Sequence, residues 1–103
     1  MLVYNITFQV DFNEARNFVI WAHQVYIQKT LESGLLQKAR LSKILSHRDE
    51  DTECFSLQFE VESSAVLHQW YTKLGKQLHD EMMALFNEKV VAFSTLMEII
   101  EEA

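Results

Sequence analysis

The amino-acid sequence predicts an α+β fold in which two helices cover one face of a four-stranded antiparallel sheet. Four segments carry apolar residues in the short or alternating patterns of β-strands, and two longer segments repeat them with the period of an α-helix. These segments follow one another in the order strand, helix, strand, strand, helix, strand. Two right-handed crossovers around a central hairpin then give the ferredoxin-like βαββαβ arrangement.

The first half of the chain supplies a strand, a helix and one arm of the hairpin. Alternation of apolar and polar residues predicts the first strand over residues 2–10. Asp11 or Asn13 can cap the helix that follows, predicted over 14–33, because a short side-chain oxygen accepts a free first-turn N–H. A second strand is predicted over 37–46.

The second half of the chain supplies the other arm of the hairpin, a second helix and the last strand. A polar loop precedes a cleanly alternating strand, predicted over 54–61. Ser63 or Ser64 can cap the second helix, predicted over 65–86. The last strand, predicted over 90–100, has apolar residues on both faces.

The length and composition favour one domain over residues 1–103. The chain has no proline, and its two glycines mark no linker; Gly34 suits instead the left-handed C-terminal cap of the first helix. Hydrophobic residues make up 49% and charged residues 23%, which are ordinary globular values and exclude disorder. The single cysteine, Cys54, excludes an intrachain disulfide framework and a multi-cysteine zinc site.

The sequence also limits location and partners. The net charge of −6 argues against binding the phosphate backbone of a nucleic acid, which needs clustered Lys and Arg. No apolar run approaches the ~20 residues that span a bilayer, and no secretory signal is visible. We therefore expect a cytoplasmic protein with neither a nucleic-acid nor a membrane partner, and the sequence shows no motif for a metal ion or another cofactor.

The strand patterns predict which face of the sheet the helices cover. That face should carry the two apolar rows, Tyr4/Ile6/Phe8/Val10 and Phe55/Leu57/Phe59/Val61. The other face should carry Val3, Asn5, Thr7, Gln9, Ser56, Gln58 and Glu60, joined by either Val91/Phe93/Thr95/Met97 or Val90/Ala92/Ser94/Leu96. Because a sheet face washed by water usually carries more charge, we expect two chains to pack these faces together as a homodimer; a solvated face rich in uncharged β-formers is the alternative.

The second helix is predicted to bury a line of leucines. At 100° per residue this line contains Leu67, Leu74, Leu78 and Leu85, with Trp70 beside it. Glu81 lies within the stripe, where a carboxylate can act as a general acid or base; reaching out past the stripe, or pairing with a basic group, is the structural alternative. His79 is expected on the surface. It lies nine residues from Trp70, about 180° around a regular helix, so the two cannot line one pocket unless the helix breaks.

The first helix carries two apolar stripes instead of one. Phe18, Ala22, Val25 and Tyr26 form the expected core stripe, whereas Ile20, Ile27 and Leu31 lie on the far side. Either the helix changes direction near Tyr26, or the second stripe meets another chain. In both cases Trp21 and Tyr26 lie where a cleft could open between helix and sheet. Aromatic residues with polar tips suit a small ligand, and they suit a closed core equally well.

Three stretches of the sequence resemble a known protein family. They are Val3-Tyr4-Asn5-Ile6-Thr7-Phe8, Gly34-Leu35-Leu36 before Ala39-Arg40-Leu41, and Phe93-Ser94-Thr95-Leu96-Met97-Glu98. They are similar to a small bacterial family filed as a domain of unknown function, which often shows His-Ile-Pro where this chain has Tyr26-Ile27-Gln28. The resemblance implies the dimeric α/β-barrel superfamily. That superfamily contains monooxygenases, isomerases, haem-degrading enzymes and proteins of no known activity, so fold alone does not choose a function.

Haem-degrading relatives use an Asn on the first strand with a Trp and a His on the second helix. Asn5, Trp70 and His79 match these residue types. We expect no such site, because Trp70 and His79 diverge around a regular helix and Asn5 alternates onto the face opposite Tyr4.

These observations favour a dimeric protein that binds a small ligand or serves as a structural module, with no catalytic constellation and no cofactor. The ligand-binding candidates are Trp21, Tyr26, Arg40, Trp70 and Glu81. Arg40 would anchor an acidic ligand, and Glu81 would accept a proton. Two alternatives remain open: a monooxygenase- or isomerase-like enzyme with a cleft between helices and sheet, and an interaction module that binds a partner through the Ile20/Ile27/Leu31 stripe.

Overall fold

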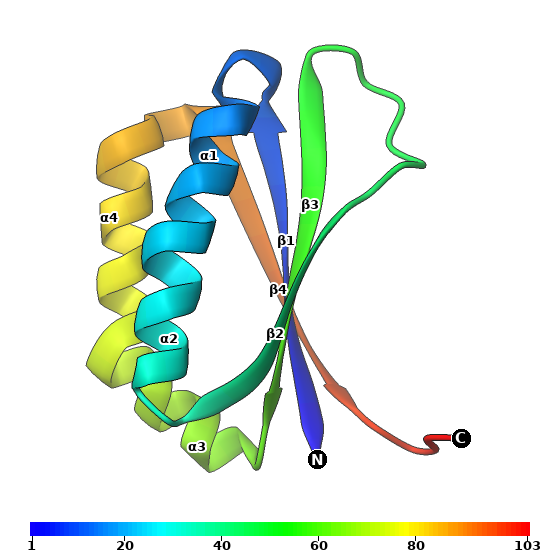
Figure 1. Ribbon diagram of the computed structural model, residues 1–103, viewed down its shortest axis with the longest axis vertical. Helices are drawn as coiled ribbons and strands as arrows, with labels where there is room; N and C mark the ends of the chain where they lie inside the picture. The colour runs from blue at the N-terminus through cyan, green and yellow to red at the C-terminus, as the bar shows by residue number, and fades with distance from the viewer.

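The computed structural model describes residues 1–103 and has the predicted order of elements (Figure 1). The chain runs β1 (Leu2–Asp11), η1 (Phe12–Glu14), α1 (Ala15–Trp21), η2 (Ala22–Ile27), α2 (Gln28–Glu32), β2 (Leu36–Lys43), β3 (Thr52–Val61), α3 (Ser64–Trp70), η3 (Tyr71–Gly75), α4 (Lys76–Phe86), η4 (Asn87–Lys89) and β4 (Val90–Glu98). The short segments η1 and η4 are 3₁₀ turns, whereas η2 and η3 are π-helical turns within the two long helices. None of the helices combines the length and the apolar composition that a membrane span requires.

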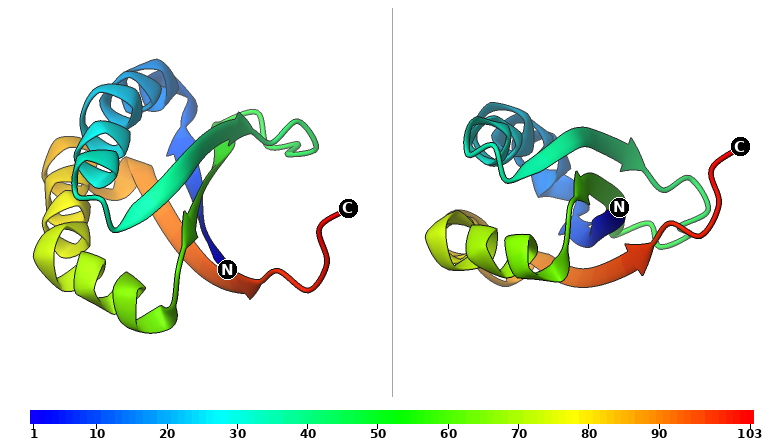
Figure 2. Two further views of the ribbon diagram at one scale, coloured as in Figure 1. Left: turned by 60° about the horizontal axis from the view of Figure 1, so that its bottom comes forward. Right: turned by 90° about the horizontal axis from the view of Figure 1, so that it is seen from below.

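The four strands form one antiparallel sheet in the order β2-β3-β1-β4, and both helices lie on the same side of it (Figure 2). The central pair, β1 and β3, comes from the two halves of the chain, and each helix crosses over to return the chain to the sheet. This topology confirms the predicted ferredoxin-like βαββαβ fold.

Local signals in the sequence account for the ends of the helices. The Asp11 carboxylate accepts a hydrogen bond from the Asn13 backbone N–H at 3.0 Å, so Asp11 is the first cap. Ser63 caps the second helix, because its hydroxyl accepts the Val66 N–H at 3.2 Å. Gly34 adopts a φ of +73°, which confirms the left-handed end predicted for the first helix.

The core fills the space between the helices and the sheet. Both predicted apolar rows face this space; Ile6, Phe8 and Leu57 are almost fully buried there. The first helix adds Phe18, whose ring centre lies 4.8 Å from that of Phe8. Edge-to-face and offset ring contacts of this kind add to the free energy gained from burial.

The other face of the sheet has no covering layer, and we call it the open face. The strand pairing places on it Val3, Asn5, Thr7 and Gln9 of β1, Arg40 and Ser42 of β2, Cys54, Ser56, Gln58 and Glu60 of β3, and Val91, Phe93, Thr95 and Met97 of β4. Of the two rows that β4 could have contributed, the register selects the one that contains Phe93, which lies 60% exposed.

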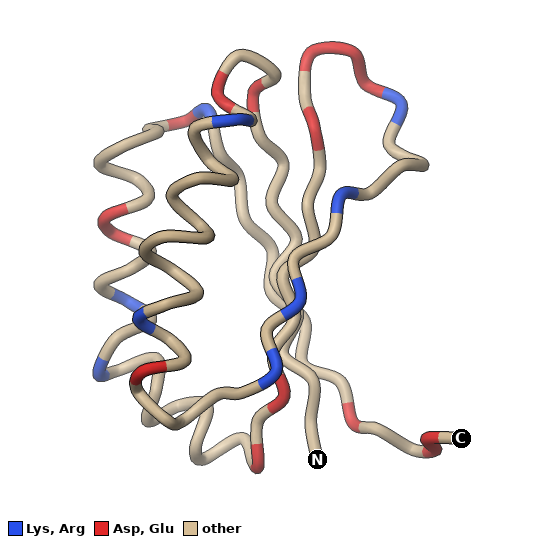
Figure 3. Tube along the Cα trace, viewed as in Figure 1, with Lys and Arg blue, Asp and Glu red and all other residues tan.

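Charged side chains are few along the middle of the open face. Figure 3 shows that β1 and β4 carry no charge over most of their length, with Asp11 and Glu98 at their ends. The hairpin loop 44–51 and the C-terminal residues 99–103 project on the side of the sheet away from the helices (Figure 1). Each of these two segments carries a strongly exposed apolar side chain, Leu45 and Ile100.

The π-helical turns change which residues the helices bury. A π turn accommodates one residue more than an α turn, so every later residue is rotated by about 100° relative to a regular helix. After η3 the buried side chains are Leu78, Met82 and Phe86, whereas Leu85 is 56% exposed. The predicted leucine line is therefore wrong at Leu85, whereas Leu78 is buried as predicted.

The first helix also contains a π turn, which interrupts its regular period. That its second stripe meets another chain stays a prediction. The turn lies at Ala22–Ile27, where a change of direction was one of the two expectations. It keeps Ala22, Tyr26 and Thr30 on the buried side at intervals of four residues. Ile20 and Leu31 stay exposed on the outer side of the layer.

Candidate functional site

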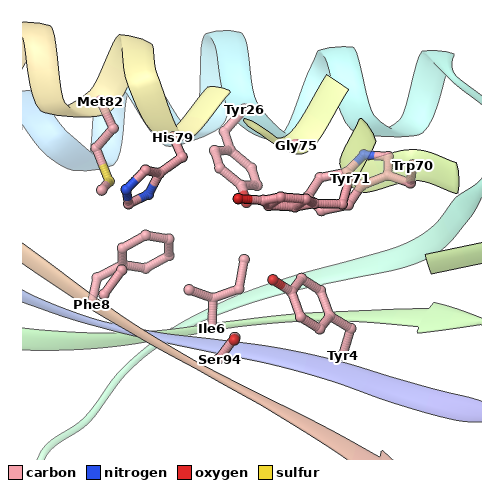
Figure 4. A pocket seen from close by; sticks show the side chains of 11 residues that line it. Tyr4, Ile6, Phe8, Tyr26, Trp70, Tyr71, Gly75, His79, Met82 and Ser94 are labelled. Atoms are coloured by element: carbon pink, nitrogen blue, oxygen red, sulfur yellow. The ribbon is translucent and has the colours of Figure 1, made fainter. Parts of the chain in front are cut away.

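A cavity of about 210 Å³ opens between the second helix and the sheet (Figure 4). Its sheet side is formed by Ile6 and Phe8 of β1 and by Ala92 of β4. Its helix side includes Met82 of α4, and Tyr26 reaches into it from the first helix. Most lining residues are hydrophobic, with a small number of polar side chains among them, as is usual for small-molecule sites.

The π turn η3 assembles the helical wall of this pocket. Trp70, Tyr71 and His79 all line the cavity, although the regular period places Trp70 and His79 on opposite sides. The additional residue within Tyr71–Gly75 reduces the angle between them to about 80°. The prediction that these two residues cannot share a pocket is thus wrong, because the helix is interrupted between them. Turns of this kind occur frequently at functional sites.

Gly75 is the residue that lets the Trp70 ring lie against the helix. A Cβ atom at this position would be 2.6 Å from Cζ3 of Trp70, well inside van der Waals contact. Trp70 is only 1% exposed, and its ring meets Tyr4 edge-on at a centroid distance of 5.8 Å. It also lies 6.3 Å from the ring of Tyr26. The indole is therefore a fixed part of the pocket wall.

Three phenol groups approach the same cavity. Tyr4 comes from β1, Tyr26 from η2 and Tyr71 from η3, and Figure 4 shows their hydroxyl ends directed toward the space between helix and sheet. Burial raises the pKa of Tyr26 far above its ordinary value, and the neighbouring phenols of Tyr4 and Tyr71 raise it further. Burial also raises the pKa of Tyr4, while a hydrogen bond with Ser94 acts in the opposite direction. Both phenols therefore stay protonated and can donate hydrogen bonds.

The pocket contains few other polar groups. Ser94 of β4 and His79 of α4 complete its polar lining, and no Asp, Glu, Lys or Arg side chain lines it. His79 and Tyr71 are exposed, so they form the mouth of the pocket, whereas Tyr26 and Trp70 form its inner end. An imidazole at the mouth can bind a polar group or transfer a proton.

The structure separates the residues that the sequence proposed as a site. Tyr26 and Trp70 line the cavity together. Trp21 is buried beside Tyr26, with ring centres 5.6 Å apart, but it belongs to the core and does not line this cavity. Glu81 is half-buried on another side of α4, because the π turn rotates it away from the predicted stripe.

Arg40 lies on the open face, opposite to the cavity. It pairs with Gln58, whereas the neighbouring residue Leu41 pairs with Leu57 on the helix side. The reversal comes from a bulge at Lys38, where φ is +56° and the register shifts between Gln37 and Arg40. Arg40 therefore cannot anchor a ligand in the pocket that Tyr26 and Trp70 line.

Sequence reasoning missed Tyr4, Tyr71, His79 and Ser94 as members of the site. The strand pattern placed Tyr4 on the helix-covered face, but nothing in that pattern indicated an unfilled space beside it. A signal for the helical members exists in Gly75, which lies in a helix interior five residues after Trp70. An isolated helical glycine often has a packing reason.

Asn5 does not take part in the pocket. Its side chain lies on the open face, where it donates a hydrogen bond to Thr7 and accepts one from Ser56. The set Asn5, Trp70 and His79 therefore does not assemble, because Asn5 lies across the sheet from the other two.

A second polar cluster surrounds the single cysteine at the base of the β2–β3 hairpin. The Cys54 sulfur lies 3.4 Å from Nδ1 of His47, whose Nε2 lies 2.7 Å from the Thr52 hydroxyl. Burial raises the pKa of the Cys54 thiol, and the nearby Asp49 carboxylate raises it further, so the reactive thiolate is disfavoured. No group of three His, Cys, Asp or Glu side chains is arranged to hold a metal ion. The aromatic pocket is the stronger candidate site.

The fold is shared with solved structures that differ strongly in sequence. A candidate antibiotic biosynthesis monooxygenase from Deinococcus radiodurans superimposes with a TM-score of 0.75 at 17% identity, covering 100% of this chain and 96% of that chain. A dimeric ferredoxin-like protein from an uncultured marine organism gives a TM-score of 0.70 at 15% identity, with 100% and 98% covered. A second dimeric ferredoxin-like protein of uncultured marine origin gives 0.67 at 11% identity, with 99% and 98% covered.

At these identities the likeness concerns the fold alone. No curated protein matches the sequence. Residues 1–100, almost the whole chain, match the family described as "Domain of unknown function (DUF4286)". The protein is therefore a member of this family, with a ferredoxin-like fold and no catalytic assignment.

Proposed function

We propose that this protein is a homodimer that binds a small planar molecule in the cavity beside Trp70. The observation that carries the proposal is the cavity itself, in which aromatic walls surround a few polar groups that point inward (Figure 4). An apolar cavity of about 150 Å³ is large enough to bind benzene. The 210 Å³ present here suits a molecule with one ring and a short substituent.

The lining favours binding over a defined reaction. Its titratable groups are three phenols and one imidazole, and it holds neither a carboxylate nor a basic side chain of Lys or Arg. The predicted proton acceptor, Glu81, does not line it. A small-molecule enzyme that uses the same pocket is the second candidate. It is favoured by His79, because an imidazole at the mouth beside Tyr71 could exchange protons with a bound substrate.

The open face supports the homodimer. Four strands about 4.8 Å apart and about 33 Å long present on the order of 600 Å², and a stable interface buries about 800 Å² on each partner. The hairpin and the C-terminal residues, which carry Leu45 and Ile100, project on the same side and would add to the contact. The proposal keeps the predicted cytoplasmic location, where a reducing environment would preserve the free thiol of Cys54.

Ligand binding is tested by filling the cavity. Ala92→Phe places a ring in the pocket, while Ala84→Phe places the same ring on the exposed side of α4 as a matched control. Single-ring aromatic compounds should raise the melting temperature of the wild type and of Ala84→Phe, and should shift the NMR signal of the Trp70 indole N–H. They should do neither in Ala92→Phe. Equal stabilisation of the two variants would show that the ligand binds elsewhere.

The dimer is tested with two substitutions of similar exposure on opposite sides of the molecule. Phe93→Asp places a charge on the open face, and Leu85→Asp places one on the helix layer. Light scattering should return twice the chain mass of 12.1 kDa for the wild type and for Leu85→Asp, and a monomer for Phe93→Asp. A wild type that stays monomeric at high concentration would refute the dimer.

A further inference from the structure

We propose that the ligand of this pocket is uncharged and carries a carbonyl oxygen that accepts a hydrogen bond from the Tyr26 hydroxyl. This inference rests on the proposed function, because it names the chemical class of the molecule bound in that cavity. It follows from one hydroxyl that faces the cavity, from the absence of charged side chains in the lining and from the size of the space.

The Tyr26 hydroxyl is the donor that faces the inner end of the cavity. The residue is only 6% exposed, yet its side chain lines the cavity and its hydroxyl points into it (Figure 4). Its neighbours Tyr4 and Tyr71 influence its ionisation without a hydrogen bond to it. A ligand that fills the inner end displaces water from this hydroxyl, and an acceptor atom on the ligand would replace the lost hydrogen bond.

The other phenols are less suited to this role. Tyr4 is engaged with the Ser94 hydroxyl, and Tyr71 lies at the exposed mouth, where water competes for its hydrogen bonds. Tyr26 therefore selects the atom that reaches the inner end of the cavity. The protonated phenol offers its O–H, and a carbonyl oxygen of the ligand is the acceptor that suits it.

The charge of the ligand follows from what surrounds it. No Lys or Arg lines the cavity to pair with a carboxylate, and no Asp or Glu lines it to pair with an ammonium group. Transfer of an unpaired charge from water into such a site is strongly unfavourable. His79 is the single lining group able to carry a positive charge, and it lies at the mouth, away from the inner end. A neutral ketone, aldehyde or amide on a single ring satisfies these conditions.

Three probes of equal size separate these features. Acetophenone, cumene and benzoate have the same number of non-hydrogen atoms and nearly the same shape, but present a neutral carbonyl, no polar atom and a charged carboxylate respectively. Calorimetric titration gives their affinities, and the shift of the Trp70 indole N–H in NMR spectra reports that each occupies the cavity. Each titration is repeated with Tyr26→Phe, which removes only the hydroxyl, and with Tyr71→Phe as the matched change at the mouth.

Acetophenone should bind the wild type about five- to tenfold more tightly than cumene, the range expected for one neutral hydrogen bond. Tyr26→Phe should abolish this preference while it still binds cumene, and Tyr71→Phe should largely keep it. Tyr26→Phe is expected to fold, because the substitution removes only a hydroxyl that faces the cavity and leaves the buried ring in place.

The other outcomes are equally distinct. If cumene binds the wild type as tightly as acetophenone, or if the preference survives in Tyr26→Phe, the Tyr26 hydroxyl does not select the ligand. If benzoate binds most tightly, the ligand is not neutral. Each of these results overturns this inference but leaves the proposed function intact. If none of the three probes shifts the Trp70 signal, the proposed function fails together with the inference.

Discussion

The two faces of the sheet are built from the same strands but differ in what covers them. Phe8 and Phe93 illustrate the difference, because both are phenylalanines on neighbouring strands and they are 2% and 60% exposed. On the helix-covered face, burial of large side chains supplies the free energy that stabilises the fold. On the open face, side chains of similar type contribute little to the isolated chain and remain free for a partner.

The covered face also contains a cavity lined mostly by hydrophobic side chains. Side chains fill most of the space between helices and sheet, but beside Trp70 they leave a cavity that the Tyr26 phenol faces. Voids larger than a water molecule are few in native cores. The comparison therefore places the stabilising core and the proposed ligand site on one side of the sheet, and the proposed association surface on the other.

The largest expected effect comes from shortening the buried phenylalanine. Phe8→Ala should lower the free energy of unfolding by about 3–5 kcal/mol, because it removes a ring that packs against Phe18 and leaves a cavity. Since small domains have only about 5–15 kcal/mol in total, the variant should be close to unfolding. Urea denaturation followed by circular dichroism measures the change. A loss below 1 kcal/mol would mean that this face is not the tightly packed one.

A smaller effect is expected at the wall of the cavity. Gly75→Ala introduces a Cβ atom 2.6 Å from the Trp70 ring, so the ring has to move and stability should fall by about 1–3 kcal/mol. The near-ultraviolet circular dichroism of the indole should change with it. Gly34→Ala is the control, because a Cβ there meets no atom within 4 Å although the φ of +73° is strained. That variant should lose stability without changing the Trp70 spectrum.

The strands could be predicted from the sequence more closely than the helices, and the reason is geometric. Backbone hydrogen bonds fix each strand residue opposite a partner, as Tyr4 lies opposite Phe59. Side chains therefore alternate between the two faces of the sheet along the whole of β1 and β3. Only the bulge at Lys38 breaks this alternation, and that bulge moved Arg40 to the open face. A positive φ at a lysine has no reliable sequence signal.

A helix has no such external reference, so one additional residue rotates everything that follows it. The phase error at Tyr71–Gly75 explains at once why Leu85 is exposed, why Glu81 leaves the core face and why His79 joins Trp70. Tyr26 and Trp70 were predicted to lie on the core side of their helices, because large aromatic side chains are buried wherever the local period permits. An unfilled cavity depends on the fit of both layers, which periodicity does not describe.

The buried phenol should make the covered face sensitive to alkaline pH. Above the ordinary tyrosine pKa of about 10 the unfolded chain loses the Tyr26 proton, whereas the folded chain retains it because burial raises the pKa. This contribution to stability is fully present below pH 10 and is lost as the pH rises, by about 1.4 kcal/mol per pH unit. Tyr26→Phe should therefore show a flatter decline of unfolding free energy in urea titrations at increasing pH. Parallel declines would indicate that Tyr26 ionises freely in the folded state.

The smallest effect is expected on the open face, and its dependence on concentration makes it informative. In dilute solution Phe93→Ala should change the unfolding free energy by no more than about 0.5 kcal/mol, as is usual for an exposed side chain. At high concentration the wild type should become more stable, because association stabilises only the folded state. Phe93→Ala should gain less, so the two proteins should differ increasingly as concentration rises. Leu85→Ala, with a side chain of similar exposure on the helix layer, should follow the wild type. If all three proteins show the same concentration dependence, the open face is not the surface through which this chain associates.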